Sequence, residues 1–156
     1  KSEVEFFKNE IEFISIIKMS NKVIFAYRTS FGKIFYFNDS FQLDSEKYFL
    51  GGLNTIRGYK QYMLFSQDNY AAGGSSFYLH SLETRFEYNE NYEIASFIDI
   101  GRINEIDNQD SKTKYSVGLS FYYLSPIGPI GITYGHKLTE EVDKFGRLYL
   151  NIGYSF

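Results

Sequence analysis

Polar and apolar residues alternate with a period of two through seven segments of the chain. Such alternation gives a β-strand one apolar and one polar face. The segments that the pattern predicts as strands are Glu3–Met19, Lys22–Phe37, Ser75–Tyr88, Tyr92–Ile103, Thr113–Leu124, Ile130–Leu138 and Gly146–Phe156. In the third and fourth segments, Glu83 and Asp99 fall opposite the faces of Leu82 and Ile98. The pattern therefore predicts an all-β, antiparallel protein with these two carboxylates on its polar side.

The connections between these segments alternate between short and long. Short turns at 20–21, 89–91 and 125–129 alternate with long loops at 38–74, 104–112 and 139–145. This layout is typical of transmembrane β-barrels, in which about 11 tilted residues cross an apolar band of roughly 25 Å. A soluble sandwich shares the alternation, but its strands are usually shorter, with about 5–6 residues. Since bacterial barrels have an even number of strands and at least about eight, we expect this chain to be the C-terminal portion of a larger barrel.

The segment 38–74 has no strand or helix pattern over roughly 36 residues, and loops that long are usually functional or disordered. It is too apolar for a solvated linker. Its apolar residues are Phe41, Tyr48, Phe49, Leu50, Leu53, Ile56, Tyr59, Tyr62, Leu64 and Phe65. A loop of this composition must be buried, and the lumen of a barrel is one place for it.

Composition narrows the function classes. Aromatic residues make up 20% of the chain, which favours strands, and no apolar run is long enough for a transmembrane helix. A net charge of −3 gives no electrostatic footprint for nucleic acid. Cysteine is absent, which excludes a thiol nucleophile or cysteine-bound zinc within this chain. No metal or cofactor motif is recognisable, and His80 and His136 fall on outward positions, where we expect interfacial residues rather than ligands.

Five stretches of the chain resemble the outer-membrane assembly superfamily, which includes the BamA, TamA and two-partner secretion barrels. The loop Gly51-Gly52-Leu53-Asn54-Thr55-Ile56-Arg57-Gly58-Tyr59 is similar to that family's Val-Arg-Gly-Phe/Tyr loop. The other four are Ser81-Leu82-Glu83, Phe97-Ile98-Asp99-Ile100-Gly101, Ser125-Pro126-Ile127-Gly128-Pro129 and Asn151-Ile152-Gly153-Tyr154-Ser155-Phe156. The resemblance implies a sixteen-stranded barrel of which this chain supplies the last seven strands, preceded by periplasmic POTRA domains.

The resemblance also assigns the site residues. It implies that Arg57 folds into the lumen and pairs with Asp99 and Glu83, because the arginine fork can bind carboxylates bidentately. The alternative is that Arg57 is an exposed loop charge. Gly51, Gly52 and Gly58 would permit the tight backbone of the loop. Tyr59 stands where the BamA branch usually has Phe, which looks nearer to the TamA branch.

The closing segment is expected to form the barrel seam, with Tyr154 and Phe156 on its apolar, outward face. Gly146 and Gly153 would weaken its pairing with the first barrel strand, although both glycines could instead accommodate barrel curvature. Tyr154 and Phe156 resemble the signal by which outer-membrane barrels are recognised for assembly. An aromatic residue at the membrane interface is the plainer interpretation of Phe156.

The function that follows from the resemblance is assembly, insertion or translocation of outer-membrane proteins, without enzymatic chemistry or a cofactor. The mechanism would be lateral opening of the seam and strand templating. The expected location is the bacterial outer membrane, and the expected partners are membrane lipids, client outer-membrane proteins, POTRA domains and accessory assembly proteins. A two-partner secretion transporter or a barrel that anchors a passenger enzyme is the alternative, and a passive porin is a third class.

Overall fold

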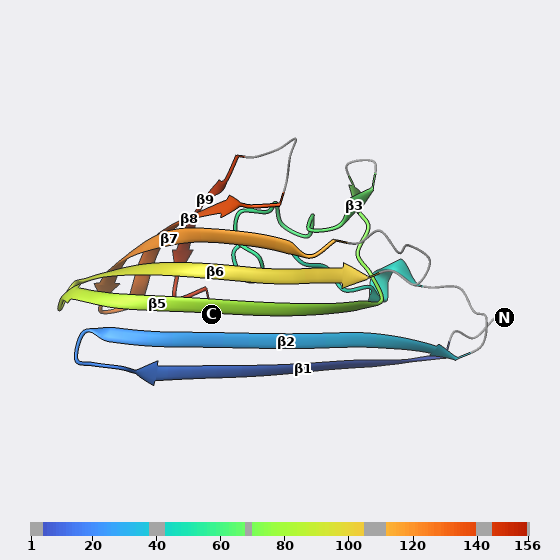
Figure 1. Cartoon of the computed structure of the whole chain (residues 1–156), viewed down its shortest axis with the longest axis horizontal. Coiled ribbons are helices and arrows are strands. Elements are labelled where there is room, and N and C mark those ends of the chain that lie inside the picture. The colour runs from blue at the N-terminus through green and yellow to red at the C-terminus, as the bar shows by residue number, and fades with distance from the viewer. Residues whose placement is uncertain (1–4, 38–42, 68–69, 105–111, 140–144, 156) are drawn as a thin grey trace.

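Seven strands, six of them long, form one antiparallel sheet in which they follow one another in chain order (Figure 1). A computed structural model describes residues 5–37, 43–67, 70–104, 112–139 and 145–155. The sheet order is β1-β2-β5-β6-β7-β8-β9. The strands are β1 (Glu5–Lys18), β2 (Val23–Phe37), β5 (Ser76–Asn89), β6 (Tyr92–Asn104), β7 (Lys114–Ser125), β8 (Gly128–Lys137) and β9 (Arg147–Ile152). In the described part of the chain, the outer edges of β1 and β9 have no partner strand.

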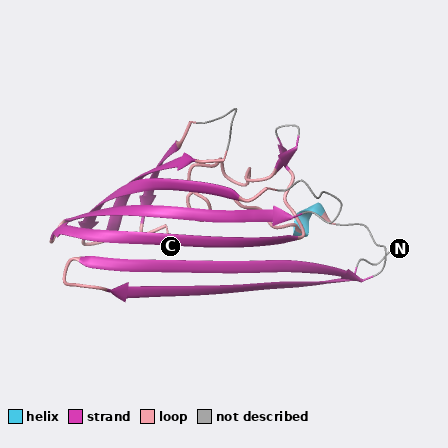
Figure 2. Ribbon diagram, viewed as in Figure 1, coloured by secondary structure: helices cyan, strands magenta, loops and turns pink. Residues whose placement is uncertain are grey.

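The segment between β2 and β5 contains small elements that the periodicity did not predict. They are the 3₁₀ helix η1 (Asp44–Glu46) and the short strands β3 (Ser66–Gln67) and β4 (Tyr70–Ala71), which pair with each other. The rest of its described residues are turns and loop (Figure 2). The segment is therefore a loop, as expected, with local structure too short to give a period. None of the described residues belongs to a helix that could span a bilayer.

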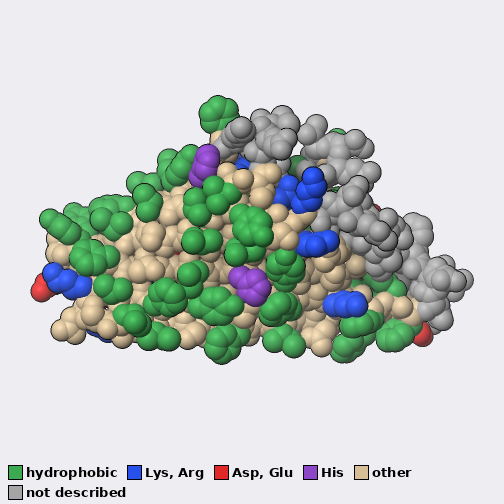
Figure 3. All heavy atoms as spheres, in the orientation of Figure 1, with side chains coloured by type: hydrophobic (Ala, Val, Ile, Leu, Met, Phe, Trp, Pro, Cys, Tyr) green, Lys and Arg blue, Asp and Glu red, His purple; other side chains and the backbone are tan. Residues whose placement is uncertain are grey.

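The convex face of the sheet is apolar and the concave face is mostly polar. On β6, Ile98 is 46% exposed, whereas its neighbour Asp99 is fully buried. Register continues these faces from strand to strand, since Ile98 pairs with Leu82 and Val117, and Asp99 with Ser81 and Ser116. Apolar side chains accordingly cover much of the outer surface (Figure 3). The expected assignment of Glu83 and Asp99 to the polar face is correct.

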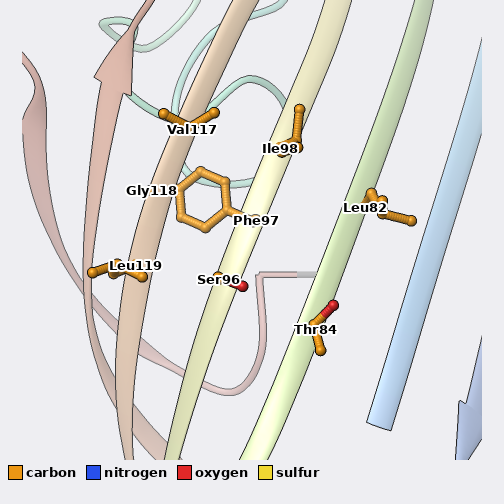
Figure 4. Close-up of a pocket in the computed structure, with 8 residues that line it drawn as sticks. All are labelled: Leu82, Thr84, Ser96, Phe97, Ile98, Val117, Gly118 and Leu119. Carbon is orange, nitrogen blue, oxygen red and sulfur yellow. The ribbon is translucent and has the colours of Figure 1, made fainter. Parts of the chain in front are cut away.

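A shallow hollow interrupts the apolar outer face across β5, β6 and β7 (Figure 4). Thr84, Ser96 and Leu119 lie side by side in the register at this place. Because Thr84 and Ser96 are short, the larger side chains around them leave a volume of about 400 Å³. The hollow is open and belongs to the outer surface, so it does not reach the loop.

The loop packs most of its apolar residues against the concave face of the sheet, whereas Tyr62 is exposed and Phe41 lies outside the described residues. The buried cluster combines loop and strand residues, namely Tyr48, Leu50, Ile56, Tyr59 and Leu64 from the loop and Ile34, Phe77, Leu79 and Ile103 from β2, β5 and β6. Burial of an aliphatic or aromatic side chain contributes about 1.5–3 kcal/mol. This cluster therefore explains why so apolar a loop stays folded on the sheet.

The closing strand is shorter than the sequence pattern predicted. β9 ends at Ile152, and Gly153 has a φ of 90°, in the left-handed region that favours glycine. The chain then turns towards the concave face, where Ser155 is buried and the Tyr154 hydroxyl bonds to Glu93. The prediction of a strand through Phe156 with Tyr154 facing outward is therefore wrong for 153–155. Phe156 itself lies outside the described residues.

Candidate functional site

Arg57 lies at the centre of the concave face and is 1% exposed. Its Nε and Nη2 donate to the two oxygens of Asp99, at 2.9 and 2.8 Å. Its backbone N–H also donates to Asp99, at 3.0 Å. Nη1 donates to Glu83 and, at 3.1 Å, to the hydroxyl of Ser155. The structure thus brings together Arg57, Asp99 and Glu83, and the arginine fork binds one carboxylate bidentately.

Neighbouring side chains complete the hydrogen bonding of the two carboxylates. Ser81 donates to Asp99 at 2.6 Å, and Arg85 Nε donates to Glu83 at 2.7 Å. Ser81 and Arg85 lie on the inward face of β5, each two residues from Glu83. Strand periodicity therefore places Ser81, Glu83 and Arg85 in one row that faces the loop.

The guanidinium of Arg57 also stacks on an aromatic ring. Its Cζ lies 3.4 Å from the centroid of Phe97 on β6. Phe97 pairs in register with Gly118 on β7, and a Cβ on Gly118 would collide with that ring. The absence of a side chain at Gly118 thus leaves room for the Phe97 ring, which packs against the guanidinium of Arg57. Stacking of this kind adds to the carboxylate contacts when the cation is desolvated.

Arg57 remains charged in this site. Burial alone would lower the pKa of its guanidinium, but the charges and hydrogen bonds of Asp99 and Glu83 more than offset burial and raise that pKa above its usual range. Removing one partner of such a buried pair typically costs about 3–5 kcal/mol, because the other charge stays behind unpaired. The arrangement is therefore a structural anchor of high consequence.

The glycines of the loop motif hold backbone conformations that other residues rarely adopt. The φ angles are 110° at Gly51, 102° at Gly52 and 94° at Gly58. At Gly58 the loop backbone also lies directly on β8, since a Cβ built on Gly135 would come within 2.5 Å of the Gly58 nitrogen. The sequence reasoning missed Gly135. An inward glycine within a strand is the signal that could have found it, since it often marks close approach of another backbone.

Residues of β8 and β9 hold the other side of the loop motif. Tyr59 hydrogen-bonds through its hydroxyl to Thr139, at 2.7 Å, just beyond β8. The hydroxyl of Tyr149 on β9 accepts from the Gly58 N–H and donates to the Tyr59 carbonyl, both at 2.9 Å. The contributions of Tyr149 and Ser155 were not foreseen either, because their partners lie about ninety residues away in the chain.

The remaining candidate residues lie around this site, and Tyr154 reaches it through Arg85, whose Cζ is 3.7 Å from the centroid of the Tyr154 ring. Gly146 precedes β9 and packs against the backbone of Gly135, and Gly153 follows β9. His80 bonds through Nδ1 to the hydroxyls of Thr29 and Tyr27, in a cluster on the outer face. In the described part of the chain, no group of three His, Asp or Glu residues is placed to hold a metal ion.

Three comparisons bear on identity. The Omp85 superfamily domain matches residues 1–156. The chain is 26% identical over 163 residues to the outer membrane protein assembly factor BamA of Nitratidesulfovibrio vulgaris (strain Hildenborough), covering 97% of this chain and 21% of that protein. The chain therefore spans about a fifth of this curated relative.

The fold also matches the crystal structure of BamA from Haemophilus ducreyi lacking POTRA domains 1–3. The TM-score is 0.72 at 16% identity, over 94% of this chain and 34% of that one. The structural match supports the antiparallel barrel-type sheet, and the family match covers the whole chain. This chain belongs to the Omp85 superfamily.

Proposed function

We propose that this chain forms the last seven strands of a sixteen-stranded barrel in the bacterial outer membrane, and that the whole protein inserts or translocates outer-membrane proteins. Membership of the Omp85 superfamily and the similarity to a BamA protein support this role. The proposed partners are membrane lipids, client outer-membrane proteins, POTRA domains and accessory assembly proteins. The proposed activity involves no bond chemistry and no cofactor.

The two faces of the sheet support the membrane location. The outer face carries isoleucine, leucine, phenylalanine and tyrosine at about half exposure, a pattern that is costly in water and suited to lipid. Strands β1 to β8 of the main sheet have 10–15 residues, close to the roughly 11 that cross the apolar core when tilted. On this basis, the long loop between β2 and β5 folds into the barrel lumen.

The observation that carries the proposed mechanism is the shortness of β9. β9 has only 6 residues, whereas the other strands of the main sheet have 10–15. Gly146 and Gly153 flank β9, and the chain leaves the strand path at Gly153. So short a strand can pair with a first barrel strand over few residues only, which makes a weak seam to which a client strand can add by β-augmentation.

A reversible lock on the seam tests this mechanism. Asn151 on β9 faces inward by register, so an Asn151→Cys disulfide to a cysteine on the first barrel strand would not disturb the lipid-facing side. In the full-length protein, we expect the oxidised form to block client insertion into vesicles and a reductant to restore it. Each single cysteine variant under oxidant is the matched control.

Full insertion with the disulfide quantitatively formed would contradict the proposal. A transporter that passes polypeptide through the barrel interior, or a barrel that anchors a passenger enzyme, would keep its activity with a locked seam. The same experiment therefore separates the proposed function from these alternatives.

A further inference from the structure

Tyr149 lies in the middle of β9 and uses its hydroxyl twice. The oxygen accepts a hydrogen bond from the Gly58 N–H at 2.9 Å, and the same hydroxyl donates to the Tyr59 carbonyl at 2.9 Å. Both partners are backbone groups of the loop motif. A hydroxyl can accept from an N–H and donate to a carbonyl with a single oxygen atom.

The loop backbone comes within reach of Tyr149 because two glycines face each other. Gly58 lies against Gly135 of β8, and a Cβ on either residue would approach backbone atoms of the other. β8 is the only strand that pairs with β9 in the described chain, where Gly135 pairs with Arg147. The loop motif therefore sits directly on β8, beside β9.

A second contact joins the end of β9 to the loop. After the turn at Gly153, the hydroxyl of Ser155 accepts a hydrogen bond from Arg57 Nη1 at 3.1 Å. Arg57 is in turn fixed to Glu83 on β5 and Asp99 on β6. β9 is thus linked to the sheet in two ways, by its backbone ladder with β8 and through the loop.

We propose that Tyr149 is a positioning residue that ties the edge strand β9 to the loop motif. When β9 leaves its place beside β8, the backbone of Gly58 and Tyr59 loses both of its hydrogen bonds to the Tyr149 hydroxyl, so movement of the edge strand and of the loop is coupled. The consequence for client insertion rests on the proposed function, whereas the tie itself does not.

Amide hydrogen exchange of the full-length barrel tests the tie without any client. Tyr149→Phe keeps the ring and removes only the hydroxyl. Loss of a hydrogen bond of this kind should raise exchange roughly three- to tenfold at Gly58 and along Arg147–Ile152. Tyr59→Phe is the matched control, because it removes a hydroxyl from the same motif that bonds to Thr139 rather than to β9.

The pattern of exchange decides the outcome. We expect Tyr149→Phe to act on Gly58 and β9 while β5 and β6 keep their protection, and Tyr59→Phe to leave β9 unchanged. Adding Ser155→Ala to Tyr149→Phe should raise exchange in β9 further. Unchanged exchange in β9, or an increase spread evenly over β5 and β6, would overturn the tie. If exchange rises as expected but vesicle insertion stays at the wild-type rate, the tie stands and its consequence for client insertion fails.

Discussion

The loop motif contacts two regions of the sheet that differ in strength. On one side, β5 and β6 pair along almost their whole length, and they bind Arg57 through two buried carboxylates. On the other side, β9 has 6 residues and contacts the loop through the neutral hydroxyl of Tyr149, and Ser155 beyond β9 accepts one hydrogen bond from Arg57. Charge-assisted bonds are roughly twice as strong as neutral ones. The comparison indicates a loop that is held firmly by β5 and β6 and weakly by β9, so displacement of β9 frees the backbone of Gly58 and Tyr59 while Arg57 keeps its two carboxylates.

The largest expected effect on stability comes from removing the bonds between Arg57 and the carboxylates of β5 and β6. Arg57→Ala in the full-length protein leaves Asp99 and Glu83 buried without their cation, and should lower the free energy of unfolding by about 3–5 kcal/mol. The free energy of unfolding of Arg57→Lys should lie between those of wild type and Arg57→Ala, because an ammonium keeps the charge but cannot make the bidentate contact. Urea unfolding, followed by the heat-dependent mobility of the barrel on a gel, measures the stability of both Arg57 variants. Lys60→Ala, which removes an exposed loop cation, is the control, and an equal loss there would contradict the assignment.

This anchor is also the part of the site that the sequence predicted best. The resemblance of the loop motif singled out Arg57, and the alternation of polar and apolar residues independently placed Glu83 and Asp99 on the inward face. Parity works there because a period of two is rigidly set by the pleat of a paired strand. The two-residue period gave the wrong face for Tyr154, because Gly153 adopts a left-handed conformation and ends the strand before it. It also could not show that Gly135 contacts the loop, because the period of a strand carries no information about residues far away in the sequence.

Two inward-facing glycines of the sheet, Gly135 and Gly101, differ in what an added Cβ would contact, and this difference should have a smaller effect on stability. An added Cβ at Gly135 meets loop backbone atoms, 2.5 Å from the Gly58 nitrogen, whereas one at Gly101 mainly meets the flexible end of Ile56. Overpacking typically costs about 1–3 kcal/mol. Gly135→Ala should therefore destabilise the full-length barrel more than Gly101→Ala and release the loop near β8. Equal unfolding midpoints for the two variants would refute the close backbone contact as the cause.

The turn after β9 should respond more locally. Gly153 has a φ of 90° and open space around its Cα, so Gly153→Ala meets conformational strain of about 1–2 kcal/mol rather than a clash. We expect the 153–155 segment to lift from the concave face, with faster amide exchange at Ser155 and little change in β5. Gly153→Asn should have a weaker effect, because Asn tolerates the left-handed region. Identical exchange in all three proteins would count against a role for this turn.

The smallest effect concerns pH. Burial, followed by the charge of Glu93 and the hydrogen bond to it, raises the pKa of Tyr154 to about 12. The stabilising contribution of the neutral phenol is therefore complete below its ordinary pKa of about 10 and is lost as pH rises through about 12. Wild type should be more stable than Tyr154→Phe at pH 9, by roughly 0.5–1.5 kcal/mol for one hydrogen bond, and this advantage should shrink by pH 11.5. A constant difference in urea unfolding midpoint across that range would be inconsistent with the Tyr154–Glu93 bond.

The most direct test of the account measures where the loop lies. The chain has no cysteine, so spin labels can be placed at Lys60→Cys in the exposed part of the loop and at Ile127→Cys in the β7–β8 turn of a full-length protein that lacks other cysteines. Pulsed electron resonance should give one narrow distance distribution in this background and a broad one after Arg57→Ala. A broad distribution with Arg57 present, or an unchanged narrow one after Arg57→Ala, would contradict the claim that Arg57 holds the loop on the wall.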